Sequence, residues 1–385
     1  MLPRPLTVDM PWVQDVLLRL LRTPSPSGRT DAVVQLVGDV LDELEVPFRL
    51  TRRGALLATV GGGNEPGERA VVVHADTIGA MVDRCKPNGR LAISPIGTWS
   101  ARFAEGGRVV VLTDDPDRHL TGTVLPLKAS GHAYGDEVDT QGVGWDHVEV
   151  RIDEPVDDAE GLAALGIQVG DFVAFDADPV VTPSRYVKAR HLDGKAGVAA
   201  ALGALKSLVE HDAPMPHRAH IMVTLAEEVG HGASHGLGPE VAEMVSIDNG
   251  VMAPGQHTME RGVTIAMRDQ TGPFDYHLTR RLLTLCEQAN IPAVRDTFRY
   301  YRSDVAAALE AGAETRAALI AFGLDASHGH ERSHLDTVQA VAELTALYLQ
   351  TELTFRHWDA RPSGPLESFP SSQQPAPTEP DLPTR

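Results

Sequence analysis

The sequence predicts a mixed α/β protein: a three-layer α/β domain interrupted by a small, β-barrel-like domain. In the first and last thirds of the chain, apolar runs with helical spacing alternate with short buried runs typical of strands. From about residue 81 to residue 187, short extended runs are separated by Gly, Pro and Asp instead. This middle region therefore looks inserted between two halves of one domain.

The first half is expected to contain two helices and a buried strand. Apolar residues recur at helical spacing over residues 12–21, and two prolines and a glycine then break the chain. Asp31 can cap a second helix that runs to about Leu44. Residues 71–73 predict a short buried strand that ends at His74. In a parallel sheet, functional side chains commonly lie just beyond the carboxyl end of a strand.

The remaining elements follow the same two patterns. The extended runs of the insert are residues 109–112, 123–125, 148–152 and 172–175. After the insert, helices are predicted over residues 196–209, 276–288, 305–311 and 335–349. Buried strands are predicted over residues 221–225, 244–247 and 317–322.

These elements suggest how the chain is divided. Residues 1–82 and 188–355 form the two parts of the α/β domain, and residues 83–187 form the inserted β-rich domain. Residues 356–385 are rich in Pro, Ser, Gln and Glu and are predicted to be disordered.

Composition excludes several classes of partner. The chain has 34 Lys and Arg against 53 Asp and Glu, a net charge of -19, which repels nucleic acids and anionic membranes. No apolar run has the length of a membrane span, and the first ten residues do not resemble a signal peptide. The two cysteines, Cys85 and Cys286, cannot build a disulfide framework, which indicates a reducing, cytoplasmic location.

A set of histidines and carboxylates follows the predicted strands. The candidates are His74, Asp76, Asp193, Glu227, Glu228, Asp248 and His334. In an α/β sheet such positions converge at one crevice. Imidazole and carboxylate ligands without thiolates suit zinc, cobalt or manganese. A pair of metal ions needs a bridging carboxylate, and adjacent carboxylates such as Glu227 and Glu228 can supply one ligand and one general base.

The order and spacing of these motifs resemble those of the tetrahedral (TET) aminopeptidases, which include glutamyl and deblocking aminopeptidases. The motifs are His74-Ala75-Asp76-Thr77-Ile78-Gly79, Leu192-Asp193-Gly194-Lys195-Ala196-Gly197, Glu227-Glu228-Val229-Gly230 and Asp248, and the resemblance covers about residues 10–352. It implies a phosphorylase/hydrolase-like catalytic domain and an aminopeptidase acting on short peptides with two divalent metal ions. It also implies that the insert mediates dimerisation and that dimers assemble into a homo-oligomeric dodecamer.

The resemblance also implies a role for each candidate. One metal ion is held by His74, Asp193 and Asp248, and the other by Asp193, Glu228 and His334. Asp193 bridges the two ions. Glu227 is the general base, and Asp76 orients His74.

Three departures from the family pattern affect the expected pocket. Family members usually carry an acidic residue at Thr77, and an acidic residue and an arginine at Gly194 and Lys195. A Gly-Gly-Thr-Asp turn is replaced by residues 301–304, Tyr-Arg-Ser-Asp. The subgroup that looks most similar is associated with the osmoprotectant N-acetylglutaminylglutamine amide (NAGGN), which suggests an N-blocked dipeptide as an alternative substrate.

Two further motifs and one non-catalytic interpretation compete with this prediction. Residues 330–334 are a literal HExxH, which would make a one-metal protease if it lay within a helix. The apolar helical period begins only after it, so Glu331 is expected to be a surface residue. Residues 232–236 match the GxSxG of serine hydrolases but do not directly follow a strand. A non-catalytic oligomeric scaffold on the same fold is the third alternative.

Overall fold

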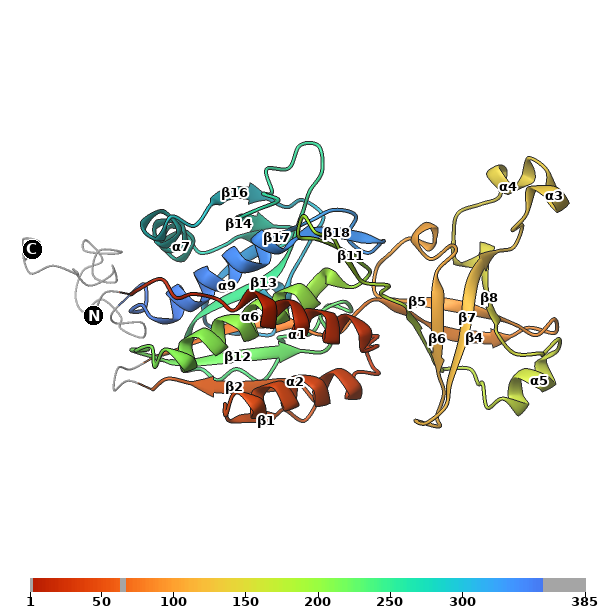
Figure 1. Ribbon diagram of the computed structural model, residues 1–385, viewed down its shortest axis with the longest axis horizontal. Helices are drawn as coiled ribbons and strands as arrows, with labels where there is room; N and C mark the ends of the chain where they lie inside the picture. The colour runs from red at the N-terminus through yellow and green to blue at the C-terminus, as the bar shows by residue number, and fades with distance from the viewer. Residues whose placement is uncertain (1–2, 63–66, 356–385) are drawn as a thin grey trace, which may run out of the picture.

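A nine-stranded sheet forms the centre of the larger part of the molecule (Figure 1). The computed structural model describes residues 3–62 and 67–355, so the tail predicted to be disordered lies outside the described residues. The strand order is β1-β2-β12-β3-β13-β17-β14-β15, with β16 beside β14. The strands are β1 (Phe48–Leu50), β2 (Leu56–Val60), β3 (Glu68–His74), β12 (Arg218–Thr224), β13 (Val241–Val251), β14 (Val263–Asp269), β15 (Gly272–Pro273), β16 (Ala293–Thr297) and β17 (Arg316–Leu324). Four neighbours, β12, β3, β13 and β17, are parallel, so their carboxyl ends share one edge.

Helices pack mainly on one face of this sheet. They are α1 (Met10–Arg22), α2 (Asp31–Glu43), α6 (Leu192–Glu210), α7 (Tyr276–Ala289) and α9 (Leu335–Leu349), and they share one hydrophobic core. A smaller core on the other face includes residues of α8 (Asp304–Glu310). The predicted mixed α/β fold is confirmed, with most of its helices on one side.

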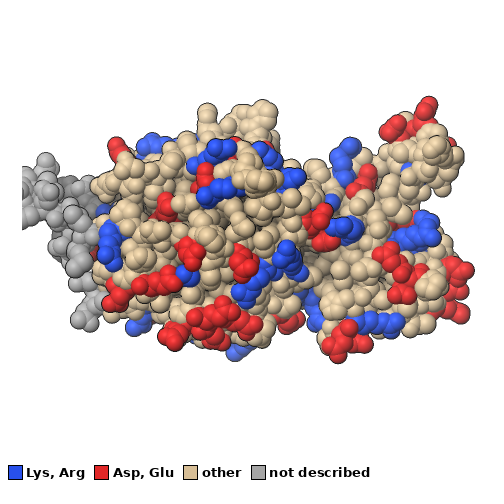
Figure 2. Space-filling model, viewed as in Figure 1, with Lys and Arg blue, Asp and Glu red and all other residues tan. Residues whose placement is uncertain are grey.

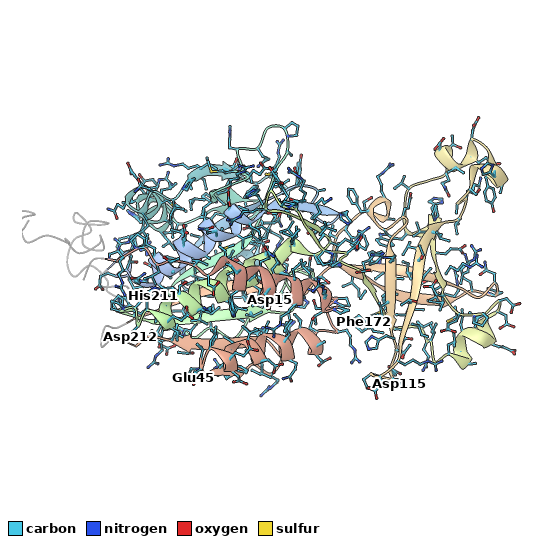
Figure 3. All side chains as sticks on the ribbon, in the orientation of Figure 1. Asp15, Glu45, Asp115, Phe172, His211 and Asp212 are labelled. Carbon is cyan, nitrogen blue, oxygen red and sulfur yellow. The ribbon has the colours of Figure 1, made fainter. Side chains whose placement is uncertain are left out.

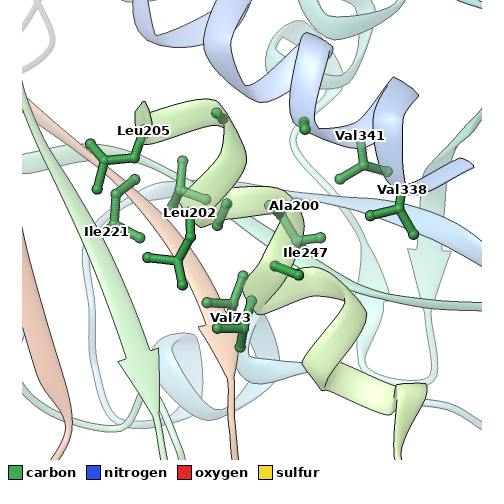
Figure 4. Close-up of a cluster of buried hydrophobic side chains, with 14 of the residues drawn as sticks. Val73, Ala200, Leu202, Leu205, Ile221, Ile247, Val338 and Val341 are labelled. Atoms are coloured by element: carbon green, nitrogen blue, oxygen red, sulfur yellow. The ribbon is translucent and has the colours of Figure 1, made fainter. Parts of the chain in front are cut away.

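Helix α6 occupies the middle of the larger core (Figure 4). Leu202 and Leu205 lie against the sheet residues Val73 and Ile221, and α9 packs on the same helix. Burying each leucine contributes about 1.5–3 kcal/mol. Small residues let the neighbouring helix approach, because a Cβ on Gly203 would lie 2.4 Å from the Val13 side chain of α1. The strongly apolar sequence of α6 thus reflects burial on nearly every side.

The insert is a closed barrel of six strands in the order β4-β5-β8-β7-β6-β9. These strands are β4 (Gly79–Cys85), β5 (Arg90–Ile96), β6 (Arg108–Leu112), β7 (His119–Pro126), β8 (Val148–Ile152) and β9 (Phe172–Phe175). Short helices between them are η1 (Ala101–Phe103), α3 (Gly131–Tyr134), α4 (Glu137–Thr140), η2 (Trp145–His147) and α5 (Ala159–Ala164). Alternate residues such as Val109 and Val111 fill the interior. The predicted β-barrel-like insert is therefore confirmed.

The barrel lies beyond the edge of the sheet where β3 ends (Figure 1). The predicted boundaries at residues 82/83 and 187/188 fall inside β4 and inside β11 (Tyr186–Ala189). Strand β11 pairs with β10 (Val180–Val181) and with β18 (Glu331–His334). Phe172 lies at the junction of the two parts (Figure 3), where a Cβ on Gly28 would be 3.1 Å from its ring.

The HExxH segment is not helical. Glu331–His334 forms the strand β18, paired antiparallel with β11, so its histidines do not share a helix face. The one-metal protease alternative is thereby not favoured.

Charged side chains of both signs are interspersed on the face shown in Figure 2, where acidic residues gather along the lower edge. Among the described residues, no helix combines the length and apolar character needed to cross a membrane.

Candidate metal centre

Five of the seven candidate residues meet at the carboxyl edge of the parallel strands. His74 is the last residue of β3, Glu227 and Glu228 follow β12, and Asp248 belongs to β13. Asp193 comes from the first turn of α6, where its ψ of 116° departs from helical geometry. Adjacent parallel strands and the helix start bring side chains from distant parts of the sequence to one place.

The first group of possible ligands consists of His74, Glu227 and Asp248, whose ligand atoms lie within 4.8 Å of one another. The Nδ1 atom of His74 lies 3.1 Å from the main-chain oxygen of Asp76. A carbonyl oxygen can only accept, so Nδ1 carries the proton and Nε2 has a free lone pair in the neutral ring. This Nε2 faces the Asp193 carboxylate at 3.2 Å, as a metal ligand would.

The second group consists of Asp193, Glu228 and His328, again within 4.8 Å. His328 lies in the loop between β17 and β18 and was not among the predicted ligands. Its Nδ1 is 2.9 Å from the main-chain oxygen of Thr98 in the inserted domain, which leaves Nε2 free. Nε2 lies 3.2 Å from Glu228 Oε2 and 3.5 Å from Asp193 Oδ2.

Asp193 stands between the two groups. Its Oδ1 faces His74 at 3.2 Å and its Oδ2 faces His328 at 3.5 Å. The Asn249 amide donates to Oδ2 at 2.8 Å and helps to hold the carboxylate. The next residue is glycine for a steric reason, because a Cβ on Gly194 would lie 2.4 Å from the His74 ring.

The structure does not bring His334 to this place. His334 caps α9, where its Nδ1 accepts from the main-chain nitrogen of Asp336 at 3.1 Å. Its Nε2 lies 3.0 Å from the main-chain oxygen of Ser184. Both ring nitrogens are thus engaged by backbone groups, and no lone pair is left for a metal ion. The prediction of His334 as a ligand is corrected on this ground, because the structure places His328, and not His334, beside Asp193 and Glu228.

Asp76 is hydrogen-bonded to three of the candidate residues, Glu227, Glu228 and His74. It is fully buried, and its carboxylate accepts from the main-chain nitrogens of Glu227 and Glu228 at 3.2 and 3.3 Å. The Ser27 hydroxyl also donates to it at 2.5 Å. Asp76 therefore orients both glutamates, and its main chain orients His74, which makes it a positioning residue.

Glu331 is buried rather than exposed, with 1% of its surface accessible. Its Oε2 accepts from the main-chain nitrogens of Leu192 and Asp193 at 2.6 and 3.2 Å, and its Oε1 accepts from the His328 nitrogen at 3.0 Å. One carboxylate therefore joins the start of α6 to the His328 loop. The expectation that Glu331 is a surface residue is wrong. Its hydrogen bonds to Leu192 and Asp193 join segments about 140 residues apart, so the local sequence gives no sign that Glu331 is buried.

We expect Glu331→Gln to destabilise the protein. A carboxylate accepts at both oxygens, whereas an amide would place an NH₂ group against a main-chain N–H. Leaving one buried donor unsatisfied costs about 1–3 kcal/mol. The change should appear as a lower urea midpoint at an unchanged m value. His330→Ala, at the exposed neighbouring position, is the control and should leave the midpoint unaltered. Equal midpoints for the two variants would contradict this role of Glu331.

The electrostatics of the centre favour bound cations. Burial would lower the pKa of His74, but hydrogen bonds to carboxylates, first that of Asp193, outweigh it and raise the pKa well above its ordinary value. The same balance raises the pKa of His328 to about 12, through Asp193 and Glu228, so without a metal ion its Nε2 holds a proton that a bound cation would displace. Burial raises the pKa of Glu227 well above its usual range. So many buried carboxylates require compensating positive charge, which divalent metal ions would supply. The donor set thus fits two such ions.

A cavity of about 1070 Å³ opens over both groups of ligands. Its wall includes Arg299, Arg302 and Tyr301 from the loop before α8. Thr77 does not belong to the wall: it is buried, and its main chain exchanges hydrogen bonds with Ser25 and Ser27. The side chain at this position therefore does not contribute to the wall of the cavity.

The GxSxG segment is no nucleophile elbow. Residues 232–236 form turns, and the Ser234 hydroxyl donates to the main-chain oxygen of His231 at 2.8 Å. A serine nucleophile needs a histidine base and a helix leaving the turn, and this segment shows neither arrangement.

Comparison with known proteins identifies the family of the chain. The sequence model of the M42 glutamyl aminopeptidases matches residues 54–344. The chain is 35% identical to "Putative aminopeptidase YhfE" of Bacillus subtilis (strain 168) over 339 residues, which cover 88% of this chain and 97% of that protein.

Solved structures share the fold at low sequence identity. An aminopeptidase from the archaeon Desulfurococcus kamchatkensis superposes with a TM-score of 0.80 at 20% identity, covering 91% of this chain and 97% of its own. The TET1 peptidase of Pyrococcus horikoshii, described as assembling into a tetrahedron or a large octahedral shell, gives 0.75 at 21% identity, covering 88% and 99%. With its family match over most of the chain, this protein belongs to the M42 glutamyl aminopeptidase family and is a metallo-aminopeptidase.

Proposed function

We propose that the enzyme binds two divalent metal ions and uses Asp193 as their bridge. His74 and Asp248 complete one site, and Glu228 and His328 complete the other. The observation that carries the proposal is the position of Asp193, whose two oxygens face the free Nε2 atoms of two histidines. A bridging carboxylate is what a pair of metal ions requires.

The reaction is hydrolysis of the amide bond that follows the first residue of a short peptide. When bound, the metal ions supply Lewis acidity for activating water and polarising the substrate carbonyl. Glu227 takes a proton from the attacking water and passes it to the leaving amine. The main-chain hydrogen bond from Glu227 to Asp76 holds this base in place. Zinc, cobalt and manganese all suit ligands of imidazole and carboxylate.

The charges around the cavity support a preference for neutral or acidic side chains. Arg302 reaches the cavity and pairs with Glu310 at 2.6 Å, so the charge of one arginine is offset. Arg299 adds a second positive charge at an exposed position. The amides of Gln256 and Gln270 add neutral polar groups. A basic substrate side chain would meet these arginines.

We therefore expect glutaminyl and glutamyl amides to be hydrolysed with a higher kcat/KM than lysyl amides, by about tenfold or more. The measurement is kcat/KM of the metal-loaded enzyme on the three aminoacyl amides, with N-acetylglutaminyl amide as a fourth substrate. A tenfold ratio of kcat/KM corresponds to a difference of about 1.4 kcal/mol in transition-state stabilisation between the two substrates.

Arg299→Gln provides the matched test of the cause. This substitution should reduce the difference in kcat/KM between glutamyl and lysyl amides and should leave kcat/KM for glutaminyl amide little changed. A preference of the wild-type enzyme for lysyl amides would contradict the proposed specificity. Hydrolysis of N-acetylglutaminyl amide alone would instead support a role in handling the osmoprotectant NAGGN.

Assembly and location complete the proposal. The inserted barrel is proposed to mediate dimerisation, and the dimers to form a dodecamer, in line with the shells described for the Pyrococcus horikoshii TET1 peptidase. Both cysteines are free, which supports a reducing cytoplasmic location.

A further inference from the structure

The hydroxyl group of Tyr301 is buried beside the candidate metal ligands and takes no part in the hydrolysis described above. The Tyr301 hydroxyl oxygen is inaccessible and has no hydrogen-bond partner among the described residues. Buried hydroxyl groups in native proteins nearly always have a partner, so one without it calls for an explanation.

The position of the Tyr301 ring is well defined. The ring packs edge-on against the buried Phe298, with 5.1 Å between centroids and an interplanar angle of 71°. The main-chain oxygen of Tyr301 accepts from the Gln270 nitrogen at 2.9 Å. The hydroxyl is therefore held in one place rather than being left free to find solvent.

That place is the wall of the cavity above the metal ligands. Tyr301 lines the cavity of about 1070 Å³ together with Asp193, Glu227 and Asp248. Burial raises the pKa of the Tyr301 hydroxyl well above its ordinary value, and the carboxylates of Asp248, Asp193 and Glu227 raise it further. Tyr301 thus places one neutral donor in the wall of a cavity that also contains these carboxylates and the guanidinium groups of Arg299 and Arg302.

We propose that the Tyr301 hydroxyl donates a hydrogen bond to the carbonyl oxygen of the scissile amide and to the oxyanion formed from it. This rests on the proposed peptide hydrolysis. When water adds, a bond forms from the water oxygen to the carbonyl carbon, and the π pair moves to the carbonyl oxygen. The carbon–nitrogen bond then breaks, and the amine leaves with the proton carried by Glu227.

Among the groups that could accept a hydrogen bond from Tyr301, the carbonyl oxygen of the scissile amide is the one that benefits most during the reaction. The carboxylates cannot stabilise negative charge on the carbonyl oxygen, and the substrate amine cannot accept a hydrogen bond when protonated. A tyrosine hydroxyl is protonated at neutral pH and keeps its proton throughout. The carbonyl oxygen is the acceptor whose charge grows during the reaction, so a fixed donor there stabilises the transition state more than the substrate.

The test is Tyr301→Phe in the full-length, metal-loaded enzyme, because phenylalanine keeps the ring against Phe298 and removes only the donor. Loss of one such donor lowers kcat by about 10²–10³-fold. KM should stay within about threefold of the wild-type value, and the number of metal ions bound per chain should not change. Tyr276→Phe is the matched control, since Tyr276 is 63% exposed and does not border this cavity. It should leave kcat unchanged.

A binding measurement separates this proposal from the hydrolytic function. A phosphinic dipeptide carries a tetrahedral, negatively charged group in place of the scissile amide. Calorimetric titration should show its affinity falling by about 10²-fold or more in Tyr301→Phe, with the affinity for the free product amino acid unaltered.

The role of Tyr301 would be overturned by several results. A kcat within threefold of the wild type would contradict it, and so would equal phosphinate affinity in the two proteins. A rise in KM alone would make Tyr301 a wall of the substrate pocket and would also overturn it. If the wild-type enzyme hydrolyses no aminoacyl amide with any metal, the proposed function fails, while the phosphinate comparison still decides on the donor.

Discussion

Glu227→Gln is expected to reduce kcat for peptide hydrolysis by about 10²–10⁴-fold, the usual contribution of a general base. Glutamine occupies the same volume but cannot take a proton from water. Bound metal should remain close to the wild-type amount, because the proposed ligands Asp193, Asp248 and His74 are intact. The measurement pairs steady-state kinetics with elemental analysis of the same preparation.

The metal content decides between two roles of Glu227. Its carboxylate lies within 4.8 Å of the ligand atoms of His74 and Asp248, so it has the position of a ligand as well as that of a base. Loss of one ion in Glu227→Gln would make it a ligand and would refute the assignment as a base. Glu240→Gln, at an exposed position, is the control for a nonspecific charge effect and should behave as wild type.

The second large effect concerns metal stoichiometry. Wild-type protein should bind two divalent ions per chain, Asp193→Ala should bind neither tightly, and His328→Ala should lose one. The reason is geometric, because Asp193 faces both histidines and His328 faces one site only. Titration of the metal-free protein followed by calorimetry measures the number of sites and the affinity of each.

His334→Asn is the matched control for His328→Ala. Asparagine keeps a capping acceptor at the start of α9, where the His334 ring now accepts from the Asp336 nitrogen. Two ions should therefore remain bound. A single ion in the wild type, or the loss of one ion in His334→Asn but not in His328→Ala, would refute the proposed pair of sites.

Much of the fold was predictable because burial leaves a periodic pattern in the sequence. The helix predicted over residues 335–349 has those same limits in α9, and the strands predicted over residues 148–152 and 172–175 match β8 and β9. Strand β18 was missed, since Glu331–His334 has no apolar alternation and exists because β11 pairs with it. Pairing with a distant strand leaves no local signal.

The candidate site was predictable to a similar extent. His74, Asp193, Glu227, Glu228 and Asp248 stand beside strand ends or a helix start in the sequence itself, and parallel strands bring such positions together. The buried carboxylate of Glu331 and the unpaired hydroxyl of Tyr301 could not be found in this way. Their importance comes from which atoms surround them.

Periodicity and position after a strand are local properties, so they were enough to predict the α/β class, the inserted β-rich domain and the carboxylates of the candidate metal centre. Which histidine faces these carboxylates depends on the folded structure. His328 and His334 lie six residues apart in the chain, and either could be a ligand by residue type. The choice depends on whether backbone groups engage one ring nitrogen or both. For His328 the deciding contact is a carbonyl oxygen of Thr98, 230 residues away in the inserted domain. A free lone pair on Nε2 thus results from long-range packing, which residue identity does not encode.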